Sequence, residues 1–241
     1  MTSAVRELAR GIWRLLPAAA RTSPRVVALR RRLGEVRFGN SSRYWEQRYA
    51  RGGTSGEGSY GRLALFKAEF LNDFVQRRGI QSVVEFGCGD GHQLSLARYP
   101  SYLGFDVAPT AIELCTKRFA ADTSKRFVLH DSLREPAPVH VAELALSLDV
   151  IYHLVEDEVF DAYMRHVFAA AKRYVIIYAS NEEAPSPAPH VRHRRFTDWV
   201  ERYEPGWRVE SHTPNRYPPS LSDGGEVSFA DFVVFAPAAL G

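Results

Sequence analysis

The hydrophobic residues of this chain follow two alternating patterns, short apolar runs and longer stretches with a helical repeat. Short runs that suit buried strands occur at 82–86, 101–106, 126–130, 143–149 and 173–179. Stretches with a helical repeat lie before and between them, at 62–78, 91–98, 109–120 and 156–171. This alternation predicts an α/β fold with a doubly wound, mostly parallel sheet.

The C-terminal part breaks the alternation. After a proline-rich loop, we expect a short helix near 197–204 and then two strands in succession, at 206–212 and 227–236. The sheet would then have seven strands. The connection between 131 and 142 is short and contains Pro136 and Pro138, which disfavour a helix there.

The first 40 residues differ from the rest in charge. They contain nine arginines and two acids, a net charge of +7, which leaves −4 for residues 41–241 out of a total of +3. Four apolar residues of this segment recur at helical spacing, Val5, Leu8, Ile12 and Leu15. We therefore divide the chain into a basic amphipathic N-terminal arm, 1–40, and a globular domain, 41–241.

We expect the arm to pack loosely on the domain or to be partly disordered. Segments that attach to an anionic membrane surface and eukaryotic transit peptides share its composition, so both alternatives stay open. A segment rich in Gly, Ser and Tyr, at 51–61, separates the arm from the rest of the domain and is predicted to be a loop.

The overall composition limits the class of protein, its cellular location and its possible partners. Hydrophobic residues make up 45% of the chain and charged residues 24%, as in ordinary soluble domains. The two cysteines, Cys88 and Cys115, provide no disulfide framework, and no apolar run is long enough to span a membrane. A cytoplasmic location is therefore expected. The net negative charge of residues 41–241 argues against nucleic acid as a partner of the domain.

The most informative segment is a glycine turn that follows the first strand. Residues 83–91 read VVEFGCGDG, with an acid two positions before the first of three alternating glycines. Glycines at such a turn let the backbone reverse sharply and approach a bound ligand closely. The dinucleotide fingerprint needs its third glycine at position 92, which is His92 here. The spacing therefore argues against a dinucleotide cofactor.

The order acid-x-Gly-x-Gly-x-Gly at Glu85–Gly91 resembles the first motif of the class I S-adenosylmethionine-dependent methyltransferases. This resemblance implies a Rossmann-like, seven-stranded sheet that is mostly parallel with an antiparallel last strand. It also implies S-adenosyl-L-methionine as the cofactor, and a helix between 131 and 142 that is reduced relative to the family.

The resemblance extends to four stations along residues 82–153. At the turn, Glu85 would meet the amino group of the cofactor, and the backbone of Gly87, Cys88 and Gly89 would approach its methionine end. Asp106, 17 residues after Gly89, ends the second strand together with Val107 and would bind the ribose hydroxyls. The alternative for Asp106 is a helix cap for the stretch that begins at Pro109.

The last two stations end the third and fourth strands. Asp131 and Ser132 would recognise the adenine, although Asp131 suits an N-cap nearly as well. Leu148 and Asp149 would reach the edge of the sheet where ligands bind in open α/β folds.

The same edge carries the candidate catalytic residues. An alcohol acceptor must lose a proton near the transition state, and His153, four residues past Asp149, is the candidate base beside that carboxylate. The alternative is an ordinary histidine on a surface turn.

Acceptor binding is assigned to two segments outside the core pattern. The loop near 181–200 contains His190, Arg192 and His193, which would offer hydrogen bonds to a polar small molecule, or else form a solvated face. Tyr60 would close over the cofactor as part of a lid. The expected function is methyl transfer to a hydroxyl of a small polar metabolite, such as a sugar.

Several alternatives remain open at this stage. They are an N-methyltransferase, an enzyme that acts on a protein or lipid, and a non-catalytic cofactor-binding subunit of a partner enzyme. Magnesium-dependent members of the family use acids that end the fourth and fifth strands. Asp149 and Asn181–Glu182 lie in comparable places, but Ser180 stands where a second acid is needed, so no metal site is expected.

Overall fold

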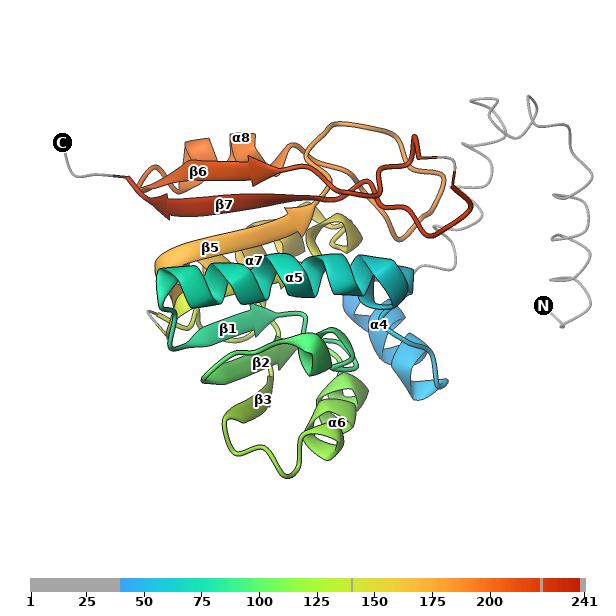
Figure 1. Cartoon of the computed structure of the whole chain (residues 1–241). Coiled ribbons are helices and arrows are strands. Elements are labelled where there is room, and N and C mark those ends of the chain that lie inside the picture. The colour runs from blue at the N-terminus through green and yellow to red at the C-terminus, as the bar shows by residue number, and fades with distance from the viewer. Residues whose placement is uncertain (1–39, 140, 222, 239–241) are drawn as a thin grey trace, which may run out of the picture.

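The computed structural model describes residues 40–139, 141–221 and 223–238. The predicted arm, 1–40, lies outside the described residues except for Asn40. The described chain forms a sheet with helices on both faces (Figure 1). The predicted fold class is therefore confirmed.

The sheet has seven strands among the described residues. They are β1 (Val83–Phe86), β2 (Tyr102–Asp106), β3 (Lys125–Leu129), β4 (Ala142–Leu148), β5 (Ala171–Ala179), β6 (Trp207–Thr213) and β7 (Asp231–Pro237). Their order is β3-β2-β1-β4-β5-β7-β6. The last strand, β7, is antiparallel to both of its neighbours, β5 and β6, while the other pairs are parallel. The expected antiparallel last strand is confirmed.

Alternate strand residues enter two separate cores. Val83 and Leu144 pack on one face, under α5 (Gly61–Arg78) and α6 (Pro109–Arg118). Their neighbours Val84 and Ala145 pack on the other face, under α7 (Asp157–Ala170) and α8 (Phe196–Tyr203). Figure 1 shows α5 lying across one face of the sheet and α7 behind it. Burial on both faces explains why these strands read as continuous apolar runs.

A helix that the sequence did not predict, α4 (Ser41–Ala50), precedes the glycine- and serine-rich segment. The Asn40 side chain accepts a hydrogen bond from the Arg43 backbone N–H at 2.8 Å and caps its first turn. Tyr49 packs with Ala108 and Ala111 at the start of α6. The helix is therefore part of the domain, and the segment after it contains a short 3-10 turn, η1 (Glu57–Ser59).

The helix predicted at 91–98 is wrong. Only a 3-10 turn, η2 (Gln93–Leu96), forms there, and Ala97 is already extended. The side chain of Asn72, on α5, donates to the Leu96 carbonyl at 3.0 Å and accepts from the Arg98 N–H at 2.7 Å. The Arg98 N–H, which a longer helix would have bonded to the Leu94 carbonyl, is thus satisfied by a side chain. The Leu96 carbonyl could not be paired in such a helix, because Pro100 has no N–H.

The connection between β3 and β4 contains no helix among its described residues, as its prolines predict. A further 3-10 turn, η3 (Ile151–His153), follows β4. Without a covering helix, Val128 and Leu129 on the edge strand β3 are 45% and 50% exposed. The uncovered connection leaves the end of β3 open toward the cavity described below.

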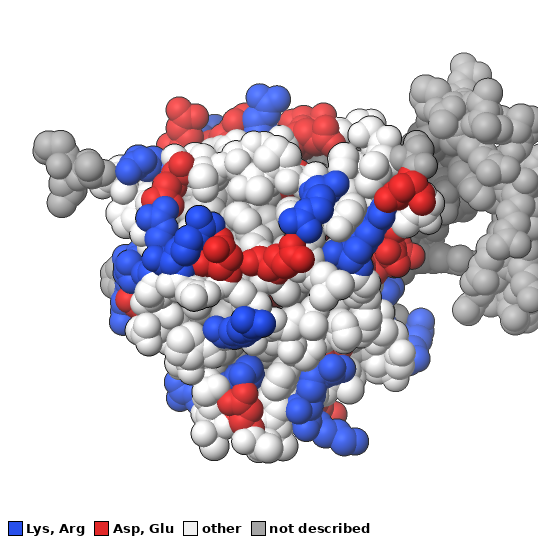
Figure 2. Space-filling model, in the orientation of Figure 1, with Lys and Arg blue, Asp and Glu red and all other residues white. Residues whose placement is uncertain are grey.

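Charged side chains of both signs are interspersed on the face that carries α5 (Figure 2). Arg62 and Arg78 of α5 pair with Asp223 and Glu210, at 2.5 and 3.0 Å. Mixed charges of this kind keep a surface soluble and contribute little to stability. No helix in the described ranges is both long and apolar enough to cross a membrane.

The orientation of α5 predicts that a leucine-to-alanine substitution has a large effect on stability at one position and a small effect at another. Leu71 is 1% exposed and Leu65 is 55% exposed. We expect Leu71→Ala to lower the free energy of unfolding by about 2–5 kcal/mol, because it removes core contacts and leaves a cavity. The matched control Leu65→Ala should change it by less than about 0.5 kcal/mol. Denaturant unfolding of both variants measures this, and similar losses would show that α5 buries a different face.

Candidate functional site

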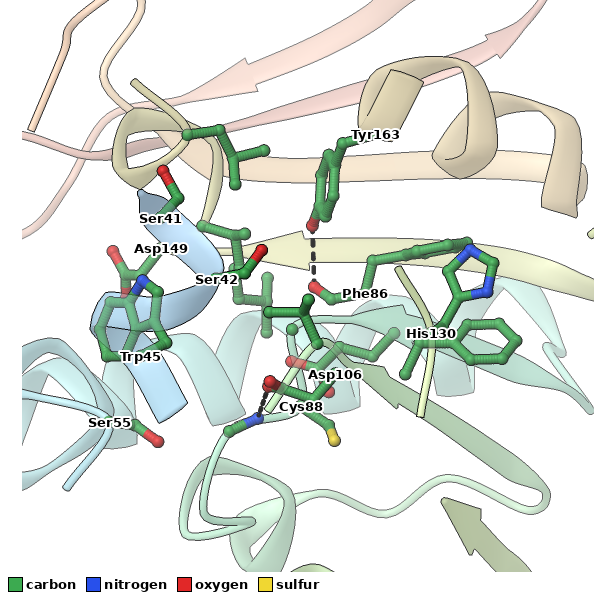
Figure 3. Close-up of a pocket in the computed structure, with 18 of the residues that line it drawn as sticks. Ser41, Ser42, Trp45, Ser55, Phe86, Cys88, Asp106, His130, Asp149 and Tyr163 are labelled. Carbon is green, nitrogen blue, oxygen red and sulfur yellow. Dashed lines mark hydrogen bonds between the residues drawn. The ribbon is translucent and has the colours of Figure 1, made fainter. Parts of the chain in front are cut away.

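A cavity of about 990 Å³, including the solvent at its mouth, opens at the carboxyl edge of the parallel strands. All nine residues that the sequence assigned to the cofactor line it, namely Glu85, Gly87, Cys88, Gly89, Asp106, Val107, Asp131, Ser132 and Leu148. Figure 3 shows Cys88, Asp106, His130 and Asp149 grouped around it from four separate segments.

The glycine turn requires glycine at two positions. Gly87 and Gly89 have φ of 83° and 58°, in the left-handed region that other residues rarely adopt. A Cβ on Gly87 would lie 2.4 Å from Cγ2 of Val150, and one on Gly89 would lie 2.3 Å from Oγ of Ser55. The turn is also tied to β2, since the N–H groups of Gly87 and Cys88 both donate to the Phe105 carbonyl. At Gly87 and Gly89 the backbone of the turn therefore lines the cavity without any side chain.

Asp106 is held by the backbone around it. One carboxylate oxygen accepts the Gly89 N–H at 2.9 Å, and the other accepts the Ala108 N–H at 2.9 Å. Each carboxylate oxygen can accept a second bond. Asp106 therefore fixes the backbone just before α6, whose N-cap Ala108 has no side-chain cap, and still presents acceptors to the cavity. Burial raises its pKa to about 6, against the opposing effect of the backbone donors.

Glu85 is buried under the turn. It accepts a hydrogen bond from the Tyr102 hydroxyl at 2.6 Å. Burial raises its pKa to about 7, although the Tyr102 bond and the nearby Lys67 ammonium oppose this shift. A carboxyl group in this state gains from a cationic ligand group, because the added charge favours its ionised form.

Asp149 has a strained backbone and two side-chain partners. Its φ of 59° is in the left-handed region, and no other described non-glycine residue has a positive φ. Its carboxylate accepts from Lys67 Nζ at 2.5 Å and from the Tyr152 hydroxyl at 2.9 Å. A Cβ on Gly58 would come within 2.7 Å of the same carboxylate. The strain is thus maintained by a fixed set of contacts at the end of β4.

The third station combines predicted and unpredicted residues. Asp131 accepts the Leu133 N–H at 3.0 Å within a turn that starts no helix, and it lines the cavity together with Ser132. His130 also lines the cavity, against the ring of Phe105, and was not identified from the sequence. A histidine beside an acid at a strand end could have suggested it.

An N-terminal cover closes one side of the cavity and was missed almost entirely. Six residues of α4 and the following segment line it, namely Ser41, Ser42, Trp45, Tyr49, Ser55 and Ser59. Figure 3 shows Ser41, Ser42 and Trp45 facing the cavity from the same helix. Without a recognised helix, nothing in the sequence indicated that these residues share one face.

The cover is fastened to the glycine turn by Asp90. Its carboxylate accepts the Ser55 N–H at 2.8 Å and the Tyr60 hydroxyl at 2.9 Å, and its own N–H donates to Ser55 Oγ at 2.9 Å. Tyr60 also stacks on His92. Tyr60 therefore holds the glycine turn and does not line the cavity.

His153 does not line the cavity. Its ring packs edge-on against Trp45, with centroids 4.9 Å apart, and its Nδ1 lies 2.9 Å from the His190 carbonyl. Burial lowers its pKa to about 4, although the bond to that carbonyl opposes the shift. The candidate base is thus neutral and weakly basic, and it lies outside the cavity lining, packed against the lining residue Trp45.

The predicted acceptor residues of the 181–200 loop also lie outside the cavity lining, which corrects their expected placement. His190 stacks on Tyr44, and Arg192 pairs with Asp157 at 2.8 Å. His193 Nδ1 lies 2.7 Å from Ser180 Oγ. These contacts attach the loop to α4, to α7 and to the residue that follows β5. The polar side chains of the loop therefore bind neighbouring protein groups and not the cavity.

The residues considered for magnesium are engaged elsewhere. Asp149 pairs with Lys67, and the Asn181 side-chain carbonyl accepts the Thr197 N–H at 3.2 Å. Within the described ranges, no group of three or more His, Cys, Asp or Glu side chains is arranged to hold a metal ion.

Comparisons with known proteins rest on structure. No family model matches the chain, and no curated protein matches its sequence. The N-methyltransferase NodS from Bradyrhizobium japonicum, solved with S-adenosylhomocysteine, is similar with a TM-score of 0.62 and 13% identity, over 82% of this chain and 98% of NodS.

Two further structures have different acceptors in their names. The mitomycin 7-O-methyltransferase MmcR is similar with a TM-score of 0.54 and 18% identity, over 74% of this chain and 55% of MmcR. The small RNA methyltransferase HEN1 is similar with a TM-score of 0.56 and 17% identity, over 76% of this chain and 26% of HEN1. The fold and strand order agree with the resemblance in the glycine turn, and the chain has the fold of the class I S-adenosylmethionine-dependent methyltransferases.

Proposed function

We propose that the protein transfers a methyl group from S-adenosyl-L-methionine to a hydroxyl of a small polar metabolite, such as a sugar. The observation that carries this proposal is the convergence of four separate sequence stations on one cavity. Their nine residues were assigned from motif order alone, and all nine line the same space. Three acids in or just after neighbouring strands, Glu85, Asp106 and Asp131, are spread along it.

The cavity fits the parts of this cofactor. The bare glycine backbone at 87–89 admits a chain that a Cβ would exclude. The Asp106 carboxylate is fixed by two backbone donors and can accept bonds from two ribose hydroxyls. His130, Asp131 and Leu148 offer aromatic, polar and apolar contacts to a base.

When bound, the cofactor supplies a methyl group that its sulfonium already activates. The protein then has to hold the acceptor in line and remove a proton. Fixing two reactants in the correct geometry can supply roughly 7–11 kcal/mol of the barrier. The cover formed by Trp45, Tyr49 and Ser55 would restrict the acceptor to one approach and exclude water.

Asp149 is the better candidate for the proton acceptor. It lines the cavity directly after β4, whereas His153 is not a lining residue and packs against Trp45. The Asp149 carboxylate oxygens each have one donor, Lys67 or Tyr152, and each keeps one lone pair. An acceptor hydroxyl bonded there would pass its proton to Asp149 as its oxygen bonds to the methyl carbon, and the bond from that carbon to the sulfonium sulfur would break, leaving the electron pair on sulfur.

The same geometry bears on the alternatives. A neutral amine acceptor needs no proton acceptor before methyl transfer, so an N-methyltransferase would tolerate loss of the Asp149 charge. The RNA named for HEN1 would require basic surface, and the net charge of residues 41–241 is −4. A protein or lipid acceptor would have to enter beneath the cover that Asp90 fastens.

The proposal as a whole is tested by incubating the full chain with methyl-labelled S-adenosylmethionine and a panel of sugars, other polyols, amines, carboxylic acids, RNA, peptides and lipid vesicles. We expect label on a hydroxyl of a small polar molecule, located by mass spectrometry. Label on nitrogen, RNA, protein or lipid would identify the corresponding alternative. No turnover with any acceptor, despite cofactor binding, would favour a non-catalytic subunit.

Cofactor binding should depend on Asp106 and on pH. We expect S-adenosylhomocysteine affinity to rise between pH 5 and 8, because Asp106 and Glu85, with pKa values of about 6 and 7, accept ligand bonds best when ionised. Asp106→Asn should weaken binding at pH 8 and remove the part of the pH dependence centred near 6. Titration calorimetry at several pH values measures this.

The exposed Asp198→Asn provides the matched control and should bind normally at every pH. Thermal unfolding of both variants separates a binding defect from misfolding. Normal binding by folded Asp106→Asn would contradict the ribose assignment. If the wild-type protein did not bind S-adenosylhomocysteine, the proposed cofactor would be wrong.

The proton acceptor is tested by comparing Asp149→Asn with His153→Gln on the acceptor found in the screen. We expect Asp149→Asn to lower kcat by roughly 10²–10⁴-fold while S-adenosylhomocysteine still binds, because only the proton step is lost. His153→Gln should keep most of the activity. The reverse result would restore His153 as the base, and near-normal activity in both would favour an acceptor that needs none.

A further inference from the structure

One residue that lines the cavity has a buried polar atom without a partner among the residues that the structure describes. Gln93, in η2 directly after the glycine turn, is 9% exposed, and its Oε1 makes no hydrogen bond to any of them. Its Nε2 donates to the Ala64 carbonyl of α5 at 3.2 Å. That carbonyl can only accept, so it fixes which end of the amide faces it. The free Oε1 is therefore an acceptor without a donor, which is costly in a buried position.

A buried cation belongs to the same part of the cavity. Lys67 lies three positions after Ala64 on α5, so the two share a helix face. Its side chain is 1% exposed, lines the cavity and pairs with Asp149. The Tyr178 ring lies 5.2 Å from Nζ on another side. An ammonium has three N–H donors, and the bond to Asp149 uses one of them.

Together with Glu85, these groups form a small set of opposite charges and dipoles beside the turn. Glu85 and Gln93 offer acceptors, and Lys67 offers donors. A ligand that satisfies this set must carry a cationic donor and an anionic acceptor close together. An α-amino acid group has this chemistry, with an ammonium and a carboxylate on one carbon.

We propose that Gln93 and Lys67 hold the amino-acid end of the cofactor, Gln93 through its Oε1 to the α-ammonium and Lys67 through a free N–H to the α-carboxylate. This inference rests on the proposed function. It adds two residues from outside the glycine motif to the cofactor site, one from η2 and one from α5. It also gives Lys67 a role in the binding step that is separate from its pairing with Asp149.

The test compares two ligands that differ only at this end. S-adenosylhomocysteine carries the amino-acid group, and 5′-methylthioadenosine keeps the adenosine and thioether but lacks it. We expect Gln93→Leu and Lys67→Met each to weaken S-adenosylhomocysteine binding by about 10- to 100-fold, as for a lost bond to a charged group. Binding of 5′-methylthioadenosine should change by less than about threefold. Retained binding of that ligand also shows that each variant is folded.

Matched controls come from exposed positions on the helices that flank the cavity. Gln76→Leu on α5 and Lys117→Met on α6 should leave the affinity for both ligands unchanged. Decarboxylated S-adenosylhomocysteine separates the two roles. It should bind less tightly than the parent ligand to the wild-type protein, and Lys67→Met, unlike Gln93→Leu, should abolish that difference.

The outcomes distinguish this inference from the proposed function. If the wild-type protein binds neither ligand, the cofactor proposal fails. If it binds both and the variants weaken them equally, or weaken neither, this inference is overturned while the cofactor proposal stands. A raised KM for the methyl acceptor with unchanged S-adenosylhomocysteine affinity would place Gln93 in the acceptor site and would also overturn it.

Discussion

The main physical constraint on this site is that three carboxylates are largely buried at one edge of the sheet. Glu85, Asp106 and Asp149 lie in or directly after β1, β2 and β4, where parallel strands bring their side chains to one edge. Removing a charge from water is expensive unless hydrogen bonds or an opposite charge replace the solvent. Asp106 receives two backbone donors, and Asp149 receives Lys67 and Tyr152. Within the described part of the chain, Glu85 receives one neutral donor, the Tyr102 hydroxyl, and lies near the Lys67 ammonium.

This arrangement has a cost to the protein without ligand. A carboxyl whose pKa is raised in the folded state binds protons more tightly there than in the unfolded chain. Stability therefore falls as pH rises from about 4, where unfolded carboxyls titrate, through the folded pKa values of about 6 and 7 of Asp106 and Glu85. A ligand that donates to these carboxylates removes part of that cost. The site is thus less stable alone than a neutral edge would be, as expected where residues are arranged for binding.

The sequence predicted the parts of the molecule where one local rule decides the structure. Strand positions followed from burial on both faces, and the glycine turn from its spacing, so β1 to β7 lie close to the expected ranges and the nine residues assigned to the cofactor line one cavity. The helix expected at 91–98 failed because Asn72, far away in sequence, pairs the backbone groups of Leu96 and Arg98. The helix α4 was missed because its residues are largely polar and half-buried, and they acquire a common face only by packing on α6. His153 and the 181–200 loop were misplaced for a similar reason, since their partners Trp45 and Tyr44 belong to that missed helix.

The charges of the cavity also bear on the direction of the proposed reaction. Five acids line it, Glu85, Asp90, Asp106, Asp131 and Asp149, against one lysine, Lys67. Burial lowers the pKa of His130, which keeps that ring neutral near pH 7. An excess of buried negative charge favours a ligand with a net positive charge, and effective interactions at close range inside a protein are several times stronger than in water. Methyl transfer converts a sulfonium into a neutral thioether, so the same acids hold the product less strongly than the donor. The buried carboxylates that destabilise the ligand-free protein would thus both select the charged cofactor and assist release of its product.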